Sequence, residues 1–233
     1  MQALFKKEIR YYLNNPIGYI ILVLFAVFAN FLFLKDIFLV GSASLRTFFN
    51  FLPWLWLVFI PAITMRSLAE EKRINTLETL LSLPVSETQI VLAKFTALSF
   101  LIFIGLGLTI VLPVSLFFLA RLYLPEVLIA YVGVALMGMG FVAISLYSST
   151  KTKNQVVAFL VSALVLFLLL VLASDFLSSV LPLRVQEIIS YFSPVYQLQP
   201  FIKGVVDLRS VVYFISLICL FLFFTIIDLE QRA

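Results

Sequence analysis

Charged residues divide the chain into long uncharged runs, and six of these runs are strongly apolar and hold 18 to 26 residues each. They cover residues 17–34, 47–65, 95–120, 127–150, 154–174 and 210–227. A helix needs about 20 apolar residues to cross the hydrocarbon core of a bilayer, so each run can span once. The runs lack the two-residue alternation of barrel strands, which leaves the helix as the spanning structure. The pattern predicts an all-α membrane protein with six transmembrane helices in a single domain, residues 1–233.

The residues before the first run have an amphipathic pattern. Apolar side chains recur at helical spacing on one side, and polar side chains occupy the other. The apolar set is Phe5, Ile9, Tyr12 and Leu13, and the polar set is Lys6, Lys7, Arg10 and Asn14. This pattern is typical of a helix in the headgroup plane, so residues 1–15 are expected to form an interfacial helix. Such a helix can anchor the protein or take part in moving the transmembrane helices.

The connection between the second and third runs, residues 66–94, also has helical periodicity. A polar stripe and an apolar stripe fall on opposite sides of a helix drawn at about 100° per residue. The stripes are Glu71, Asn75, Glu78 and Ser82, against Ile74, Leu77, Leu80 and Leu81. We expect the leucines to be buried against the membrane helices and the carboxylates to face solvent, as far as Pro84. Ser86 to Gln89 then reads S-x-x-Q, a capping box that starts the third span. A solvated loop helix and a docking surface both fit this segment.

A second long connection, residues 175–209, separates the fifth and sixth runs. Its apolar residues Val185, Ile188, Ile189 and Phe192 follow the spacing i, i+3, i+4 and i+7. That spacing predicts a short amphipathic helix. Pro194 and Pro200 are expected to interrupt it.

The distribution of positive charge predicts the orientation. With six spans, ten of the 16 Lys and Arg residues lie on the side of the two termini. Three of the other six lie in the long 175–209 connection, which weighs less in the positive-inside rule. Both termini and residues 66–94 are therefore expected in the cytoplasm. The net charge of +4 and the pI near 9.2 then reflect anchoring at the cytoplasmic face, and nucleic-acid binding is not indicated.

The residue types exclude several kinds of chemistry. The chain has no His, and its one Cys lies in the last apolar run, so neither a His–Cys metal site nor a His-dependent nucleophile can form. Its glycines form no P-loop and no G-x-G-x-x-G motif. The six runs hold no ionisable group of the kind that carries a coupling ion, which disfavours a secondary transporter. The sequence predicts no catalytic residue, metal or cofactor in this chain.

Short motifs along the chain give a more specific signal. They read PAITMR over residues 61–66, AEE over 69–71, TLE over 76–78, LL over 80–81 and PVS over 84–86, with Lys94 after them. Further motifs are NQ over residues 154–155, SP over 193–194, KGVVD over 203–207 and LEQR over 229–232. Over nearly the whole chain these motifs closely resemble the ABC-type-2 exporter permeases, particularly their gliding-motility-like branch. Asn75 stands where that family usually has Gly, and Asn reaches left-handed backbone angles at modest cost.

The resemblance implies a coupling helix within residues 66–94 that docks on a separate ABC ATPase subunit, which would bind ATP and Mg²⁺. The implied docking residues are Glu70, Glu71, Arg73, Thr76 and Glu78, and the implied packing residues are Leu77, Leu80 and Leu81. It also implies a second permease chain, in a homodimer or a heterodimer. On the outer side it implies a gate that dips into the outer leaflet, formed by Val185, Ile188, Ile189, Phe192 and Pro194. A plain cap helix fits these outer residues equally well.

Two function classes remain open. The preferred one is a permease subunit in the cytoplasmic (inner) membrane that exports a hydrophobic or amphipathic substrate while its partner hydrolyses ATP. The alternative is a membrane scaffold in a cell-envelope or gliding-motility assembly, in which an ATPase drives mechanical work and no cargo crosses.

Overall fold

The computed structural model describes residues 2–40, 45–76, 80, 85–119, 123–172, 182, 185 and 189–231, and every regular element within them is helical. Five helical stretches are long and apolar enough to cross a membrane. They are Pro16–Leu34, Leu45–Arg73, Glu87–Leu116, Leu124–Thr150 and Leu208–Glu230. The fifth predicted span contains a shorter apolar helix, Gln155–Val171. The helical membrane fold is thus confirmed with five candidate spans, and a crossing by residues 154–174 stays a prediction.

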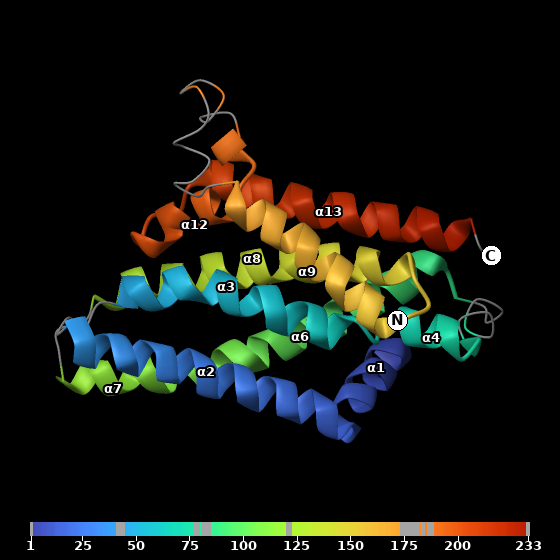
Figure 1. The fold of residues 1–233 in the computed structure, drawn as a ribbon, viewed down its shortest axis with the longest axis horizontal. Coiled ribbons are helices and arrows are strands. Elements are labelled where there is room, and N and C mark those ends of the chain that lie inside the picture. The colour runs from blue at the N-terminus through green and yellow to red at the C-terminus, as the bar shows by residue number, and fades with distance from the viewer. Residues whose placement is uncertain are drawn as a thin grey trace.

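The long helices run lengthwise beside one another, with α1 and α4 at one end and α7 at the other (Figure 1). The helices are α1 (Gln2–Asn14), α2 (Pro16–Val40), α3 (Leu45–Thr64), α4 (Ala69–Arg73), α6 (Glu87–Thr109), α7 (Val111–Leu119), α8 (Leu124–Thr150), α9 (Gln155–Val171), α12 (Pro194–Ile202) and α13 (Leu208–Glu230). Helix α8 is the centre of the bundle, because it packs against α3, α6, α9, α12 and α13. Any displacement of α8 would therefore be transmitted to these five helices.

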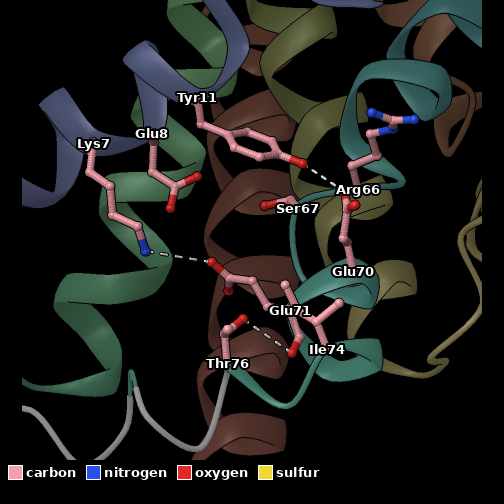
Figure 2. Close-up of a pocket in the computed structure, with 9 residues that line it drawn as sticks. All are labelled: Lys7, Glu8, Tyr11, Arg66, Ser67, Glu70, Glu71, Ile74 and Thr76. Carbon is pink, nitrogen blue, oxygen red and sulfur yellow. Dashed lines mark hydrogen bonds and ion pairs between the residues drawn. The ribbon is translucent and has the colours of Figure 1, made fainter. Parts of the chain in front are cut away.

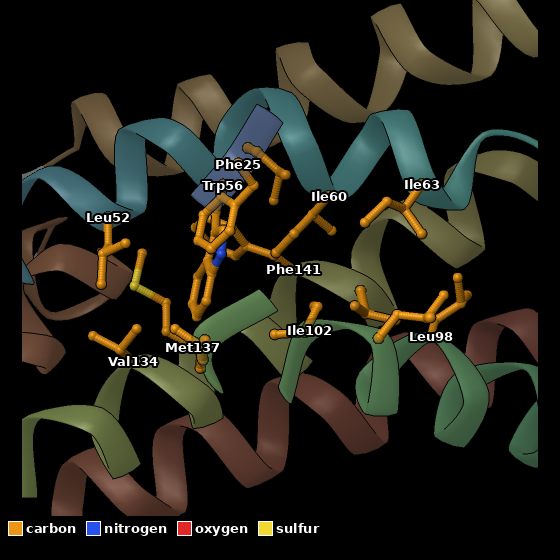
Figure 3. Close-up of a cluster of buried hydrophobic side chains, with 14 of the residues drawn as sticks. Phe25, Leu52, Trp56, Ile60, Ile63, Leu98, Ile102, Val134, Met137 and Phe141 are labelled. Atoms are coloured by element: carbon orange, nitrogen blue, oxygen red, sulfur yellow. The ribbon is translucent and has the colours of Figure 1, made fainter. Parts of the chain in front are cut away.

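The core lies where α2, α3, α6 and α8 meet (Figure 3). Trp56 of α3 stacks on Phe25 of α2, with 6.4 Å between the ring centroids. Met137 and Phe141 of α8 and Ile102 of α6 are buried in the same cluster. Since lipid is as apolar as these side chains, close packing holds the helices together here more than the removal of apolar surface from water does.

Helix α12 lies against α8 through one very close contact. A Cβ on Gly133 would lie 2.4 Å from the Cβ of Phe201, so only glycine allows this approach. Pro194 begins α12, and Pro200 lies inside it, two residues before its end. Pro200 therefore does not break α12, which is a different helix from the one predicted around Ile189. A proline in the last turn removes few backbone hydrogen bonds, and packing on α8 supports the rest.

Candidate functional site

The predicted N-terminal helix exists as α1, and a tight turn sets it at an angle to α2 (Figure 1). The Asn15 side chain accepts a hydrogen bond from the Ile17 N–H at 3.1 Å, and its carbonyl accepts one from the Gly18 N–H at 3.0 Å. A Cβ at Gly18 would lie 2.3 Å from the carbonyl oxygen of Tyr12, so the turn requires glycine there. The turn directs one face of α1, with Glu8 and Tyr12 buried, against α6 and α2.

Helix α4 is short, and its two ends explain why. At its start, the Ser149 hydroxyl of α8 accepts hydrogen bonds from the N–H groups of Leu68 and Ala69 at 3.2 and 3.0 Å. At its end, Asn75 has a left-handed backbone with φ of 56°. The prediction of one helix through Ser82 is wrong, because a left-handed Asn ends a helix as Gly commonly does. Asn75 thus adopts the left-handed backbone that Asn reaches at modest cost.

Lys94, directly before the third predicted span, is the most deeply buried cation among the described residues. Its side chain is 2% exposed. The ammonium lies 2.9 Å from a Glu8 oxygen and 2.8 Å from a Glu71 oxygen, and it donates to the Ser67 carbonyl at 3.2 Å. An ammonium has three N–H donors, and three different segments use them here. Lys94 therefore joins α1, the residues before α4, and α4 itself.

A second buried cation, Lys72, lies on the other side of α4. Its ammonium donates to the Thr150 carbonyl at the end of α8 and lies 3.9 Å from a carboxylate oxygen of Asp228 in α13. The other Asp228 oxygen accepts from Lys151 at 2.8 Å. This hydrogen bond is the main reason why the pKa of Lys151 is raised, since it stabilises the protonated amine. Helix α4 is thus tied to the ends of α8 and α13.

A cleft of about 250 Å³ opens between α1 and α4 (Figure 2). Tyr11 donates a short 2.6 Å hydrogen bond to Glu70 across it, and the Lys7 ammonium lies 3.8 Å from a Glu71 oxygen. Burial and this contact with Glu70 raise the pKa of Tyr11 from 10.0 to about 12. The Thr76 hydroxyl donates to the Glu71 carbonyl at 3.4 Å. The cleft is therefore lined by side chains of both signs that are already engaged with one another.

The predicted docking residues divide into two groups. Those in the tip, residues 73–76, are exposed, and those in the base, Glu70 and Glu71, contact other side chains. Arg73 and Thr76 are exposed, and the Arg73 guanidinium lies 3.8 Å from a Glu70 oxygen. The expectation that the Glu71 carboxylate faces solvent is wrong: its side chain is 16% exposed, because Lys94 and Lys7 hold it inward. Glu78 lies outside the described residues.

The residues of the predicted apolar stripe in the same segment also differ in exposure. Ile74 was expected on the buried side but is 55% exposed, since the chain turns at the next residue, Asn75. Leu80 is buried as predicted. Leu77 and Leu81 lie outside the described residues.

The predicted outer segment is described in part. Val185 and Phe192 are exposed, Ile189 is half-buried, and Pro194 is buried as the first residue of α12. Ile188 lies outside the described residues. Helix α12 contacts α8 at Gly133, whereas α4 contacts α8 at Ser149, so the two elements lie near opposite ends of α8.

Sequence reasoning missed several residues of this site, among them Glu8, Lys72 and Asp228. Glu8 is the one acidic residue among the first fifteen, and Asp228 directly follows the last apolar run. Lys94, quoted only as part of a motif, directly precedes another apolar run. Arg46, Lys153 and Arg209 also directly precede uncharged runs and are exposed, so a position at the edge of a run does not by itself identify a buried charge.

The fold and this site define a multi-pass helical membrane protein with the two buried cations Lys94 and Lys72 at one end of the bundle. Its sequence matches the family model described as ABC-2 family transporter protein over residues 7–227. The chain belongs to this family, and it is accordingly the membrane-spanning permease subunit of an ABC transporter, which works with an ABC ATPase. A comparison with curated proteins found no match.

Proposed function

We propose that this permease subunit exports a hydrophobic or amphipathic substrate across the cytoplasmic (inner) membrane, and that a separate ATPase drives it by docking at the tip of the 66–94 segment. One observation carries the docking proposal. The tip, residues 73–76, is exposed, while the base of the same segment is fixed by the buried cations Lys94 and Lys72. A surface that must receive force from a partner needs both an accessible contact and a stiff attachment.

The contact between the tip and the ATPase would contribute more to the choice of partner than to the binding affinity. The tip offers the guanidinium of Arg73, the apolar side chain of Ile74 and the hydroxyl of Thr76. Rim charges change partner choice and register more than total affinity. Glu70 and Glu71 support the tip from behind, and Glu78 stays in the proposed docking set. In this proposal ATP and Mg²⁺ are bound by the partner alone.

The same proposal gives the molecule its orientation and partners. The α4 end, with α1 and the end of α13, would face the cytoplasm, in agreement with the excess of Lys and Arg there. Two permease chains, identical or different, would form the pathway between them. The outer residues around Phe192 and Pro194 would act as its gate. The chain's motifs favour the gliding-motility-like branch of the family.

The docking proposal is tested by reversing charge and polarity at the tip. The double variant Arg73→Glu, Ile74→Asp should abolish the ATP hydrolysis that co-elutes with the tagged, detergent-solubilised chain. Membrane insertion should stay normal, since both side chains are exposed. The matched control is Lys153→Glu, which reverses an exposed charge in the α8–α9 connection. Unchanged co-elution of ATP hydrolysis with the double variant would contradict the docking proposal.

Export is tested separately from docking. The complex is reconstituted in liposomes and tested with a panel of lipids and amphipathic compounds, one at a time. The compound that is the cargo should increase the rate of ATP hydrolysis, and it should accumulate on one side of the membrane. An active complex that moves none of them would favour the scaffold alternative.

A further inference from the structure

Two consecutive residues of α4 engage opposite sides of the bundle. Glu71 lies 2.8 Å from the Lys94 ammonium, which also binds Glu8 near the start of the chain. Lys72 donates to the Thr150 carbonyl and lies 3.9 Å from Asp228 near the end of the chain. Neighbouring positions on a helix point about 100° apart, so two adjacent side chains can engage different partners. Helix α4 is therefore held from two directions, by the first and the last helix of the described chain.

The chemistry of these contacts makes them stiff. Lys94 and Lys72 are 2% and 4% exposed at the side chain, so neither ammonium can exchange a lost partner for water. A buried charge that loses its partner is strongly unfavourable, and such contacts either persist or break as a unit. An exposed pair such as Arg73 with Glu70 has no such constraint.

We propose that Lys94 and Lys72 are positioning residues that clamp the coupling segment to α1 and to the end of α13, so that these three elements move as one body. The rigidity follows from the buried contacts alone. Its use in transmitting ATP-driven motion rests on the proposed function. Displacement of the tip would then reach α2 through α1, and it would reach α13 directly, in addition to α3 and α6, which border the segment in sequence.

The rigidity is tested without any ATPase. Spin labels at Lys6→Cys in α1 and Arg73→Cys in α4, in a Cys219→Ser background, report the distance between two exposed positions. We expect one narrow distance distribution, at least twofold broader in Lys94→Met. Because Lys94→Met can impair folding, Glu8→Gln serves as a second variant that keeps the side-chain shape and the Glu71–Lys94 pair. Glu230→Gln, an exposed change in α13, is the control and should leave the distribution narrow.

The opposite side of the clamp is tested in the same way. Labels at Arg73→Cys and Gln231→Cys should give a narrow distribution that broadens in Asp228→Asn and stays narrow in Lys153→Met. Distributions that remain narrow in both Glu8→Gln and Asp228→Asn would overturn the proposal, because another contact would then fix α4.

Transmission is measured in the complex with its ATPase, with ATP as the ligand. Labels at Lys6→Cys and Lys203→Cys, near opposite ends of the bundle, should change their separation on ATP addition. Glu8→Gln should reduce this change at least twofold while the ATPase still co-purifies, because the docking tip is untouched. An undiminished change in Glu8→Gln would overturn the transmission role. If no ATPase co-purifies with the wild type but Glu8→Gln still broadens the α1–α4 distance, the proposed function fails and the clamp stands.

Discussion

The two ends of the bundle are held together by different physics. At the α4 end, buried ammonium groups are shared among carboxylates and carbonyls from several helices. At the other end, the ion pair between Arg46 and Glu126 is short, 2.7 Å, but its side chains are 57% and 27% exposed. There, close apolar packing between α8 and α12 provides the attachment. The α4 end thus depends on the pairing of buried charges, whereas the α12 end depends on the fit of apolar side chains, and different substitutions should weaken each of them.

The largest effect is expected at the α4 end. Lys94→Met leaves the buried Glu8 and the half-buried Glu71 without their shared cation and should lower the free energy of unfolding by about 3–5 kcal/mol. Unfolding in mild detergent measures this loss. Lys153→Met removes an exposed ammonium and should leave the unfolding midpoint unchanged. Equal midpoints for Lys94→Met and the wild type would remove the basis of the comparison.

The packed end should respond to volume instead of charge. Gly133→Ala adds a methyl group where Phe201 leaves no room, and it should destabilise the fold by about 1–3 kcal/mol. Gly107→Ala is the matched control, because no atom lies within 4 Å of the added Cβ. It should be neutral or stabilising by up to about 1 kcal/mol, since Ala favours the helix. The same unfolding measurement ranks the two variants, and similar results for both would contradict the tight contact.

A smaller, pH-dependent effect is expected at Tyr11. Its pKa is raised from 10.0 to about 12, so the phenol of the unfolded chain ionises first as the pH rises. This contribution to stability is complete below pH 10 and is lost as the pH approaches about 12. Tyr11→Phe should therefore flatten the decline of the unfolding midpoint in that window. Tyr123→Phe, at an exposed position, is the comparison and should keep the wild-type slope.

The smallest effect is expected for the exposed ion pair. Arg46→Gln should leave the unfolding midpoint within experimental error, because solvent screens a pair that is this exposed. Glu126→Gln should behave in the same way. A large loss in either variant would mean that both ends depend on charge.

Much of the fold could be predicted because its signals are local. Uncharged runs long enough to span gave the helices, and S-x-x-Q gave the start of α6, where the Ser86 side chain accepts a hydrogen bond from the Gln89 N–H. The spacing of apolar residues in the N-terminal segment also predicted its helix, α1. Each of these signals depends on residues only a few positions apart.

The candidate site was less predictable, because its contacts join distant parts of the chain. Nothing near Glu71 in sequence indicates that Lys94 holds it inward, nor that Glu8, 86 positions from Lys94, shares the same cation. The periodic pattern predicted that the α4 helix continues through Asn75. Periodicity carries no information about a left-handed backbone at a single residue, so it could not show where the helix ends. Local patterns located the segment, and three-dimensional packing decided which of its side chains are exposed.

The central claim is that the tip of α4 is the contact for the ATPase, and cross-linking tests it most directly. A photoreactive side chain introduced in place of Ile74 should cross-link, in native membranes, to a P-loop ATPase identified by mass spectrometry. The same group in place of Val205, exposed near α12, should not. Cross-linking of the ATPase from position 205 and not from position 74 would contradict the account.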